Sequence, residues 1–421
     1  MPTAEDAGPF PEGFMWGTAA SATQTEGAAP SSDWWRWEQL GRAPASGDGN
    51  GFASRHAEDF ALFAELGLTH HRLSLEWSRL EPRQGHHDGG AIEHYREVLR
   101  AGGTAGLSMW ACLHHFTLPG WFSEDLGGFV DDHSRSLHWA RHVDFVAETF
   151  GDLIHGWMPI NEPVAYAAGG YLDGSMPPGR TGADHFLGAL RAIHLANVDA
   201  ARLLHGNGQP VATVMNLSPI TAQASSTDPA ALDKAREWAA LIDQVIWGWT
   251  RMLREGVLEI PMTADIEVPA GVGSFDLVGF SHYHSATVDE HGAMGPFPID
   301  GDVGPLGYVP AAEGLGECLE RLADELPGRP LVISEFGVGT PRRATRSEDA
   351  VEDERRSDIL ERALGIVAAK IAGGIDVRGF FHWSGVDNYE WLHGHDVCFG
   401  LMDADRNRRG SAEVAESWAR G

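Results

Sequence analysis

Eight short apolar runs, separated by stretches with helical spacing, constrain the fold of this chain more than any other feature of its sequence. Near-continuous apolar runs of this length are typical of parallel strands that are covered by helices. The runs are GFMWGTAAS from Gly13, HHRLSLEW from His70, GLSMWACLHHF from Gly106, IHGWMPINE from Ile154, PVATVMNLSPI from Pro210, FDLVGFSHYH from Phe275, PLVISEFG from Pro330 and GFFHWSG from Gly379.

The segments between these runs place apolar residues at helical intervals, as Phe60, Phe63 and Leu66 do within residues 54–66. Similar patterns occupy residues 134–150, 184–205, 231–255, 312–326 and 347–372. Eight strands that alternate with helices predict an α/β protein with a single (β/α)8 TIM barrel. No change of composition marks a linker, so we predict one catalytic domain over residues 1–421.

Charge and composition narrow the classes of partner. The 421 residues include 31 Lys and Arg against 60 Asp and Glu, a formal net charge of -29. This excess repels nucleic acid and anionic membranes, so we predict neither as a partner. The start, Met-Pro-Thr-Ala-Glu-Asp, lacks the pattern of a secretory signal, and no apolar run is long enough to span a bilayer. Together with three scattered cysteines (Cys112, Cys318 and Cys398), this predicts a cytoplasmic protein with reduced thiols. The sequence leaves the oligomeric state open.

Polar side chains gather where the predicted strands end, which is where barrel enzymes carry their active sites. Among them are the carboxylates Glu162, in the turn Asn161-Glu162-Pro163, and Glu335, in the seventh run. A carboxylate in such a place is costly to desolvate unless it is paired or used. The other polar or aromatic residues at predicted strand ends are Gln24, Arg72, Glu76, His115, Asn161, Asn216, Tyr283 and Trp383.

Six motifs, in order along nearly the whole chain, resemble those of glycoside hydrolase family 1, the retaining β-glucosidases and β-glycosidases. They are GFMWGTAASATQTEGA with Gln24, HRLSLEWSRLEP with Arg72, LHHFTLPGWF with His115, NEP at 161–163, ISEFG at 333–337, and HWSGVDNYEW from His382 followed by FGL at 399–401. The sequence departs from the family pattern at Phe336, at Ser281-His282, at Pro159-Ile160 and at Cys398. These departures bear on substrate preference and pH optimum.

The resemblance implies an enzyme in which Glu162 is the acid/base and Glu335 the nucleophile of a double displacement. Arg72 would pair bidentately with Glu335, and Tyr283 would donate a hydrogen bond to it. The resemblance further implies sugar contacts by Gln24, His115, Asn161, Glu390, Trp383 and Trp391. The competing interpretations are structural ion pairs for the glutamates and Arg72, and core packing for Tyr283 and the tryptophans. Glu76 and Asn216 are assigned neither to the pocket nor to the core.

The predicted substrate is a small β-glycoside or oligosaccharide, most simply an unphosphorylated β-glucoside, with β-galactosides and β-fucosides as further substrates. LHGHDVCFGLMDAD, from Leu392 to Asp405, has no Lys or Arg to hold a phosphate. We predict no cofactor, and no metal site, because adjacent histidines such as His114-His115 point to opposite faces of a strand. The alternative functions are a transglycosylase, a 6-phospho-β-glycosidase and a non-catalytic sugar-binding barrel.

Overall fold

The structure is a computed structural model that describes residues 10–421, so the prediction about the first six residues lies outside the described part. Its central sheet has eight strands in the order β4-β3-β2-β1-β14-β12-β9-β5, and every pairing in this sheet is parallel. Each strand overlaps one of the eight predicted runs, which confirms the strand prediction. The strands are β1 (Met15–Ala19), β2 (His70–Ser74), β3 (Ser108–Cys112), β4 (Gly156–Trp157), β5 (Met215–Asn216), β9 (Val278–His282), β12 (Leu331–Phe336) and β14 (Val377–Trp383).

The two outer strands of this sheet, β4 and β5, meet and close it into a barrel. Trp157 forms a parallel bridge with Val211, just before β5. The Trp157 N–H donates to the Pro210 carbonyl at 2.9 Å, and the Ala212 N–H donates to the Trp157 carbonyl at 2.8 Å. The (β/α)8 prediction is therefore confirmed, and the prediction of a single domain stays a prediction.

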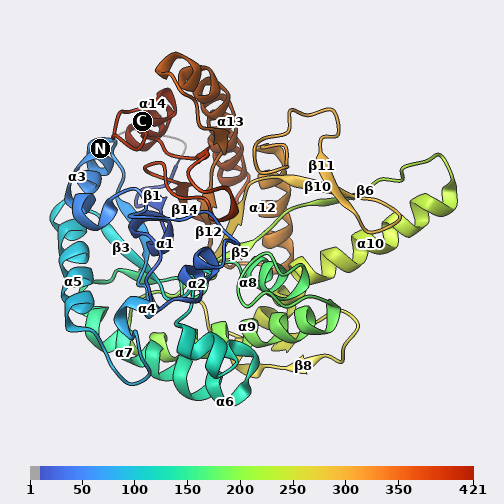
Figure 1. Cartoon of the computed structure of the whole chain (residues 1–421). Helices are drawn as coiled ribbons and strands as arrows, with labels where there is room; N and C mark the ends of the chain where they lie inside the picture. Colours follow the sequence, from blue (N-terminus) through green and yellow to red (C-terminus); the bar gives the residue numbers. More distant parts are fainter. Residues whose placement is uncertain (1–9) are drawn as a thin grey trace.

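Helices surround the strands on the outer side of the barrel (Figure 1). The predicted helical ranges correspond to α3 (Phe52–Glu65), α6 (Asp132–Ser134) with a π-helical turn and α7 (Ala140–Phe150), α9 (Ala183–Leu204), α10 (Pro229–Trp247) with α11 (Trp249–Glu255), α12 (Glu313–Glu325) and α13 (Arg346–Ala372). The predicted helix over 231–255 is divided at Gly248, where an added Cβ would lie 2.5 Å from the Glu259 carbonyl oxygen. No helix within residues 10–421 has the length and apolar character needed to cross a membrane.

Among the helices of more than ten residues in the described chain, two were not predicted, α5 (Gly89–Thr104) and α14 (Gly410–Arg420). Four of the residues of α5 are glycines, which have low helix propensity and obscure the pattern. Its start is fixed instead by Asp88, whose side chain accepts a hydrogen bond from the Ala91 N–H at 2.9 Å.

Large apolar side chains fill the inside of the barrel, and glycines on neighbouring strands make room for them. Met15, Trp110, Phe381 and Trp383 belong to one buried cluster inside the barrel. An added Cβ at Gly156 would lie 2.4 Å from the Trp110 ring. The barrel is thus a packed core, and a ligand can enter only above it, where the strands end.

A second, small sheet lies beside the barrel together with α10 (Figure 1). Its strands are β6 (Ile220–Ala222), β10 (Ser285–Val288) and β11 (Met294–Phe297), in the order β11-β10-β6. Both β6 and β10 directly continue chain segments that leave the barrel after β5 and β9. This sheet was not predicted, because β6 and β10 lie at or directly after the ends of predicted runs and give no separate signal.

Candidate active site

The carboxyl ends of the barrel strands bring the predicted site residues into one connected group. Gln24 lies in the short helix α1 (Ala22–Glu26) after β1, and Glu390 and Trp391 lie in the segment after β14. His115 follows β3, Asn161 and Glu162 follow β4, Tyr283 follows β9, Glu335 lies in β12 and Trp383 ends β14. The contacts described below link these residues to one another across the barrel mouth.

Glu335 is held at both carboxylate oxygens. Its Oε1 forms an ion pair with Nη1 of Arg72, and its Oε2 accepts a hydrogen bond of 2.7 Å from the Tyr283 hydroxyl. The Glu335 side chain is 4% exposed, so both contacts act in a poorly hydrated environment. A cation and a hydroxyl donor stabilise the ionised carboxylate and fix the direction of its oxygens.

Arg72 differs from the prediction in two respects. It lies inside β2 rather than at the end of the strand, and its side chain is fully buried. It does not pair bidentately with Glu335, because its second terminal nitrogen, Nη2, donates to Oδ1 of Asn161 at 2.6 Å. From this buried position, the planar guanidinium contacts residues of two other strand ends and orients a carboxylate and an amide together.

Glu162 directly follows Asn161 and is only partly buried. Its backbone lies in the left-handed region (φ 43°), directly before the helix α8 (Pro163–Ala167), and its N–H donates to the Val214 carbonyl at 2.9 Å. Burial, and then the nearby charge of Glu335, raise the pKa of Glu162 to about 8, while a hydrogen bond from Ser281 acts in the opposite direction. Burial and the charge of Glu335 therefore favour the protonated form of Glu162.

Backbone conformations of this unusual kind are concentrated at the site. Five residues other than glycine have a positive φ in the described chain, and three of them are Phe116, Glu162 and Trp391. Such conformations cost of order 1–3 kcal/mol each and persist where surrounding structure imposes them. Phe116 follows His115, and Trp391 follows Glu390, so each strained position aims a predicted site residue.

Amide, imidazole and carboxylate groups cover the rest of the predicted sugar site. Nε2 of Gln24 donates to the Glu390 carboxylate at 3.2 Å and to the Tyr389 carbonyl at 2.8 Å. Burial, with Glu335 nearby, raises the pKa of Glu390 to about 8. His115 is buried, its pKa is far below the usual value because of burial and the charge of Arg72, and its Nε2 lies 3.4 Å from the Asn161 amide nitrogen.

The rings of three residues are stacked nearly parallel to one another. His115 stacks on Trp383 with the ring centres 5.5 Å apart and on Trp391 at 6.1 Å, with interplanar angles of 18° and 15°. Trp383 is buried, whereas Trp391 is partly exposed. A partly exposed indole at a pocket edge has an apolar face available to the C–H side of a sugar ring.

The two residues left unassigned by the sequence differ in their surroundings. Glu76 is a structural residue, since its carboxylate accepts hydrogen bonds from Ser78 Oγ at 2.5 Å and Thr117 Oγ1 at 2.7 Å. Asn216 pairs in register with Ser281, and its Oδ1 is buried without a hydrogen-bond partner in the described chain.

Sequence reasoning missed Ser281 and Tyr308 as site residues. Ser281 was noted only as a departure from the family pattern, although its hydroxyl acts on Glu162. Tyr308 stacks on His284 with ring centres 4.2 Å apart, and Glu390 and Glu162 lie close enough to contribute to the raised pKa of its hydroxyl. The alternation of side chains along β9 could have identified Ser281, since it shares a face with Tyr283. Tyr308 lies in a loop whose path no local pattern predicts.

Two other departures, Phe336 and His282, are buried and contact the core and the backbone. Phe336 packs against Phe380 with ring centres 5.5 Å apart, within the core between sheet and helices. Nδ1 of His282 lies 2.9 Å from the Leu217 carbonyl oxygen. Within residues 10–421, no cluster of three or more His, Cys, Asp or Glu side chains is arranged to hold a metal ion.

Comparison with known proteins gives one family. The family model described as Glycosyl hydrolase family 1 matches residues 6–417. The coniferin β-glucosidase of Pinus contorta is 26% identical over 459 residues (95% of this chain and 88% of the relative), and the putative β-glucosidase 5 of Arabidopsis thaliana is 27% identical over 461 residues (97% and 89%). The solved β-glycosidase from Pyrococcus horikoshii superposes with a TM-score of 0.86 at 29% identity, covering 98% of this chain and 95% of that chain. The chain therefore belongs to glycosyl hydrolase family 1 and is a glycoside hydrolase.

Proposed function

We propose that this enzyme is a retaining exo-β-glycosidase that hydrolyses unphosphorylated β-glucosides through a covalent glycosyl-enzyme intermediate. The observation that carries the proposal is that the surroundings of two carboxyl groups favour opposite protonation states. Arg72 and Tyr283 hold Glu335 as an oriented carboxylate, whereas burial and the Glu335 charge keep a proton on Glu162. A division of this kind between two neighbouring carboxyl groups supplies one nucleophile and one general acid.

In the first step, a carboxylate oxygen of Glu335 attacks the anomeric carbon. The bond from that carbon to the leaving oxygen breaks, and the leaving oxygen takes the proton of Glu162. The product is a glycosyl ester, which removes the negative charge of Glu335. Because that charge contributes to the raised pKa of Glu162, its loss lowers this pKa and prepares Glu162 to act as a base.

In the second step, Glu162 takes a proton from water while the water oxygen bonds to the anomeric carbon. The ester bond to Glu335 breaks, and its electron pair restores the carboxylate. Arg72 and Tyr283 stabilise the returning charge through the contacts that they make in the free enzyme. The two inversions together give a sugar with retained configuration, which proton NMR early in the reaction would detect as the β-anomer.

Matched variants test the two roles. Glu335→Ala should abolish turnover of every substrate. Glu162→Ala should still form the intermediate from a substrate with a good leaving group, and added azide should restore turnover and give a β-glycosyl azide. Equal losses in both variants, without rescue by azide, would contradict the assignment.

The proposal of an unphosphorylated sugar rests on the charges near Glu390. The segment from Leu392 to Asp405 carries no Lys or Arg, and Asp396 adds negative charge. Arg342 reaches this segment from outside, but its Nε donates to the His395 carbonyl. We expect kcat/KM for an aryl β-glucoside to exceed that for the matching 6-phospho-β-glucoside, and the reverse order would overturn this part of the proposal.

A further inference from the structure

A pocket of about 410 Å³ lies between α2 (Asp33–Gln39) and the turn at residues 177–180, apart from the group of catalytic residues. Three arginines line it: Arg36 and Arg42 come from α2 and the segment after it, and Arg180 comes from the turn. The chain has a formal net charge of -29, so three guanidinium groups around one pocket form a local concentration of positive charge on an otherwise acidic protein.

The acidic groups of this pocket do not neutralise all three arginines. Glu124 forms an ion pair with Arg36. Within residues 10–421, neither Arg42 nor Arg180 forms an ion pair, and the Arg42 guanidinium lies over the Trp37 ring at 4.4 Å. The remaining acid, Asp33, is buried and accepts a hydrogen bond from the Leu118 N–H at 3.0 Å, and burial raises its pKa to about 7.

The pocket is built by contacts between its two sides. Nε1 of Trp37 donates to the Ser175 carbonyl at 3.2 Å, which ties α2 to the segment before the turn. Gly179 has a φ of +74°, and an added Cβ would lie 2.5 Å from the Trp37 ring and 3.0 Å from Nη1 of Arg42. The turn therefore approaches the indole and the guanidinium as closely as a glycine allows.

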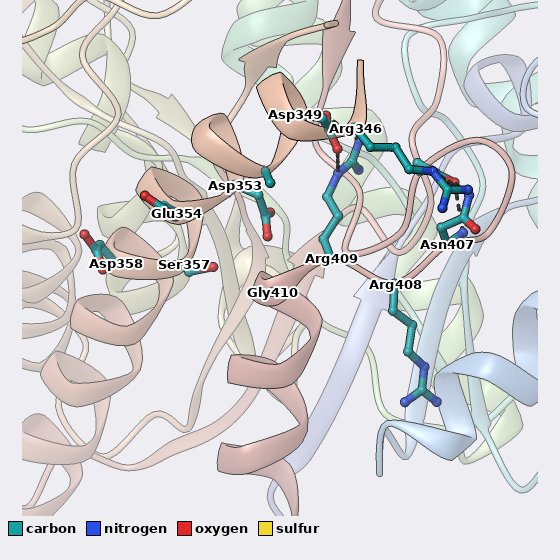
Figure 2. A pocket seen from close by; sticks show the side chains of 12 residues that line it. Arg346, Asp349, Asp353, Glu354, Ser357, Asp358, Asn407, Arg408, Arg409 and Gly410 are labelled. Atoms are coloured by element: carbon teal, nitrogen blue, oxygen red, sulfur yellow. Dashed lines mark hydrogen bonds and ion pairs between the residues drawn. The ribbon is translucent and has the colours of Figure 1, made fainter. Parts of the chain in front are cut away.

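A cleft near the C-terminus shows that arginines alone do not make such a site. Arg346, Arg408 and Arg409 line this cleft between α13 and α14 (Figure 2). Arg409, however, pairs with Asp349 and Asp387. The lining also includes the acidic residues Asp349, Asp353, Glu354, Asp358 and Asp403, so acidic groups outnumber the arginines.

We propose that the pocket lined by Arg36, Arg42 and Arg180 binds a tetrahedral oxyanion of the phosphate or sulfate class. Guanidinium groups donate paired N–H hydrogen bonds to the oxygens of such anions. Because guanidinium groups are weakly hydrated, they readily exchange water for an anion. The bound oxyanion is either a free inorganic ion or an anionic group on the leaving part of the substrate. The second of these ligands rests on the proposed function. Trp37 belongs to the same aromatic cluster as Trp34 and Tyr389, against which Trp391 of the sugar site packs.

Isothermal titration of the full chain with inorganic phosphate, at constant ionic strength maintained with chloride, tests the site without using catalysis. We expect phosphate to bind, and the double variant Arg42→Gln/Arg180→Gln to weaken binding by about tenfold or more. Arg346→Gln is the matched control, because it removes an exposed arginine from the acidic cleft and should leave phosphate binding unchanged. Hydrolysis of a neutral aryl β-glucoside should remain unchanged in both variants, which verifies that they fold.

A second measurement separates the two sources of the anion. The ratio of kcat/KM for a sulfated aryl β-glucoside to that for the neutral glucoside is compared between the wild-type protein and the double variant. A lower ratio in the variant assigns the site to the substrate, and an unchanged ratio together with phosphate binding assigns it to a free ion. Failure of phosphate to bind the wild-type protein, or equal binding by the double variant, would overturn the proposal.

Discussion

Removal of the Tyr283 hydroxyl tests how much its hydrogen bond stabilises the negative charge of Glu335. The hydroxyl donates to Oε2 at 2.7 Å, and no other side chain in the described chain donates to that oxygen. A hydrogen bond to a charged group contributes roughly 1.5–3 kcal/mol, and each 1.36 kcal/mol corresponds to about tenfold in rate. Tyr283→Phe should therefore slow the affected step by about 10- to 150-fold.

The affected step should be the second one. In the first step Glu335 gives up its charge, so loss of the hydrogen bond weakens the starting state as well as the transition state. In the second step the charge returns to Glu335 as the ester breaks, and only the transition state gains from the hydroxyl. The intermediate should consequently accumulate, and kcat and KM for an activated aryl glucoside should fall together.

Stopped-flow measurement of phenol release from 2,4-dinitrophenyl β-glucoside would detect this change as a burst equal to the enzyme concentration. Tyr308→Phe is the matched control, since it removes another hydroxyl near Glu162 and Glu390 that makes no bond to Glu335. A cooperative unfolding transition in both variants would verify that they fold. The reasoning is refuted if Tyr283→Phe loses kcat without a burst, or if Tyr308→Phe produces the same loss.

Four further outcomes follow from charges in the structure. Activity as kcat/KM should fall as the pH rises through about 8, where Glu162 loses its proton, and a pH profile would show this alkaline limb. The pKa of Glu162 in the folded protein lies above the unfolded value of about 4.3, so the stability contributed by its protonation is complete below pH 4.3 and is lost as the pH rises through 8. Glu162→Gln cannot ionise and should therefore be more stable than the wild type at pH 8. Chemical unfolding should show a difference of about 2 kcal/mol, a value reduced to allow for the partial exposure of Glu162. Arg406→Ala should lower the free energy of unfolding by about 3–5 kcal/mol in the same assay, because it leaves the buried Asp59 carboxylate without the cation that now lies 2.7 Å away. A smaller loss on replacing both residues with leucine would support this cause. Glu390→Ala should raise KM and lower kcat together on glucosides, and unchanged steady-state kinetics would remove Glu390 from the sugar site.

The sequence by itself determined the strands, their parallel arrangement and the class of the site. Apolar runs that alternate with helical patterns are local signals, and polar residues lie at or near the predicted strand ends, at the same edge of the barrel. For that reason Glu162, Glu335, His115 and Gln24 could be assigned to one pocket before any distance between them was known. The helix α5 escaped prediction because its glycines weakened the local signal on which such predictions depend.

The tertiary structure decided which groups meet across the barrel. Only the register of β2 against its neighbours places the Arg72 guanidinium between Glu335 and Asn161, where it contacts both residues instead of pairing with Glu335 alone. The raised pKa of Glu162 depends in the same way on burial and on a carboxylate 173 residues distant in the sequence (335 minus 162). A periodic pattern specifies the face on which a side chain lies, but the distance between side chains on separate segments depends on strand stagger and loop path. Those are set only when the whole barrel closes.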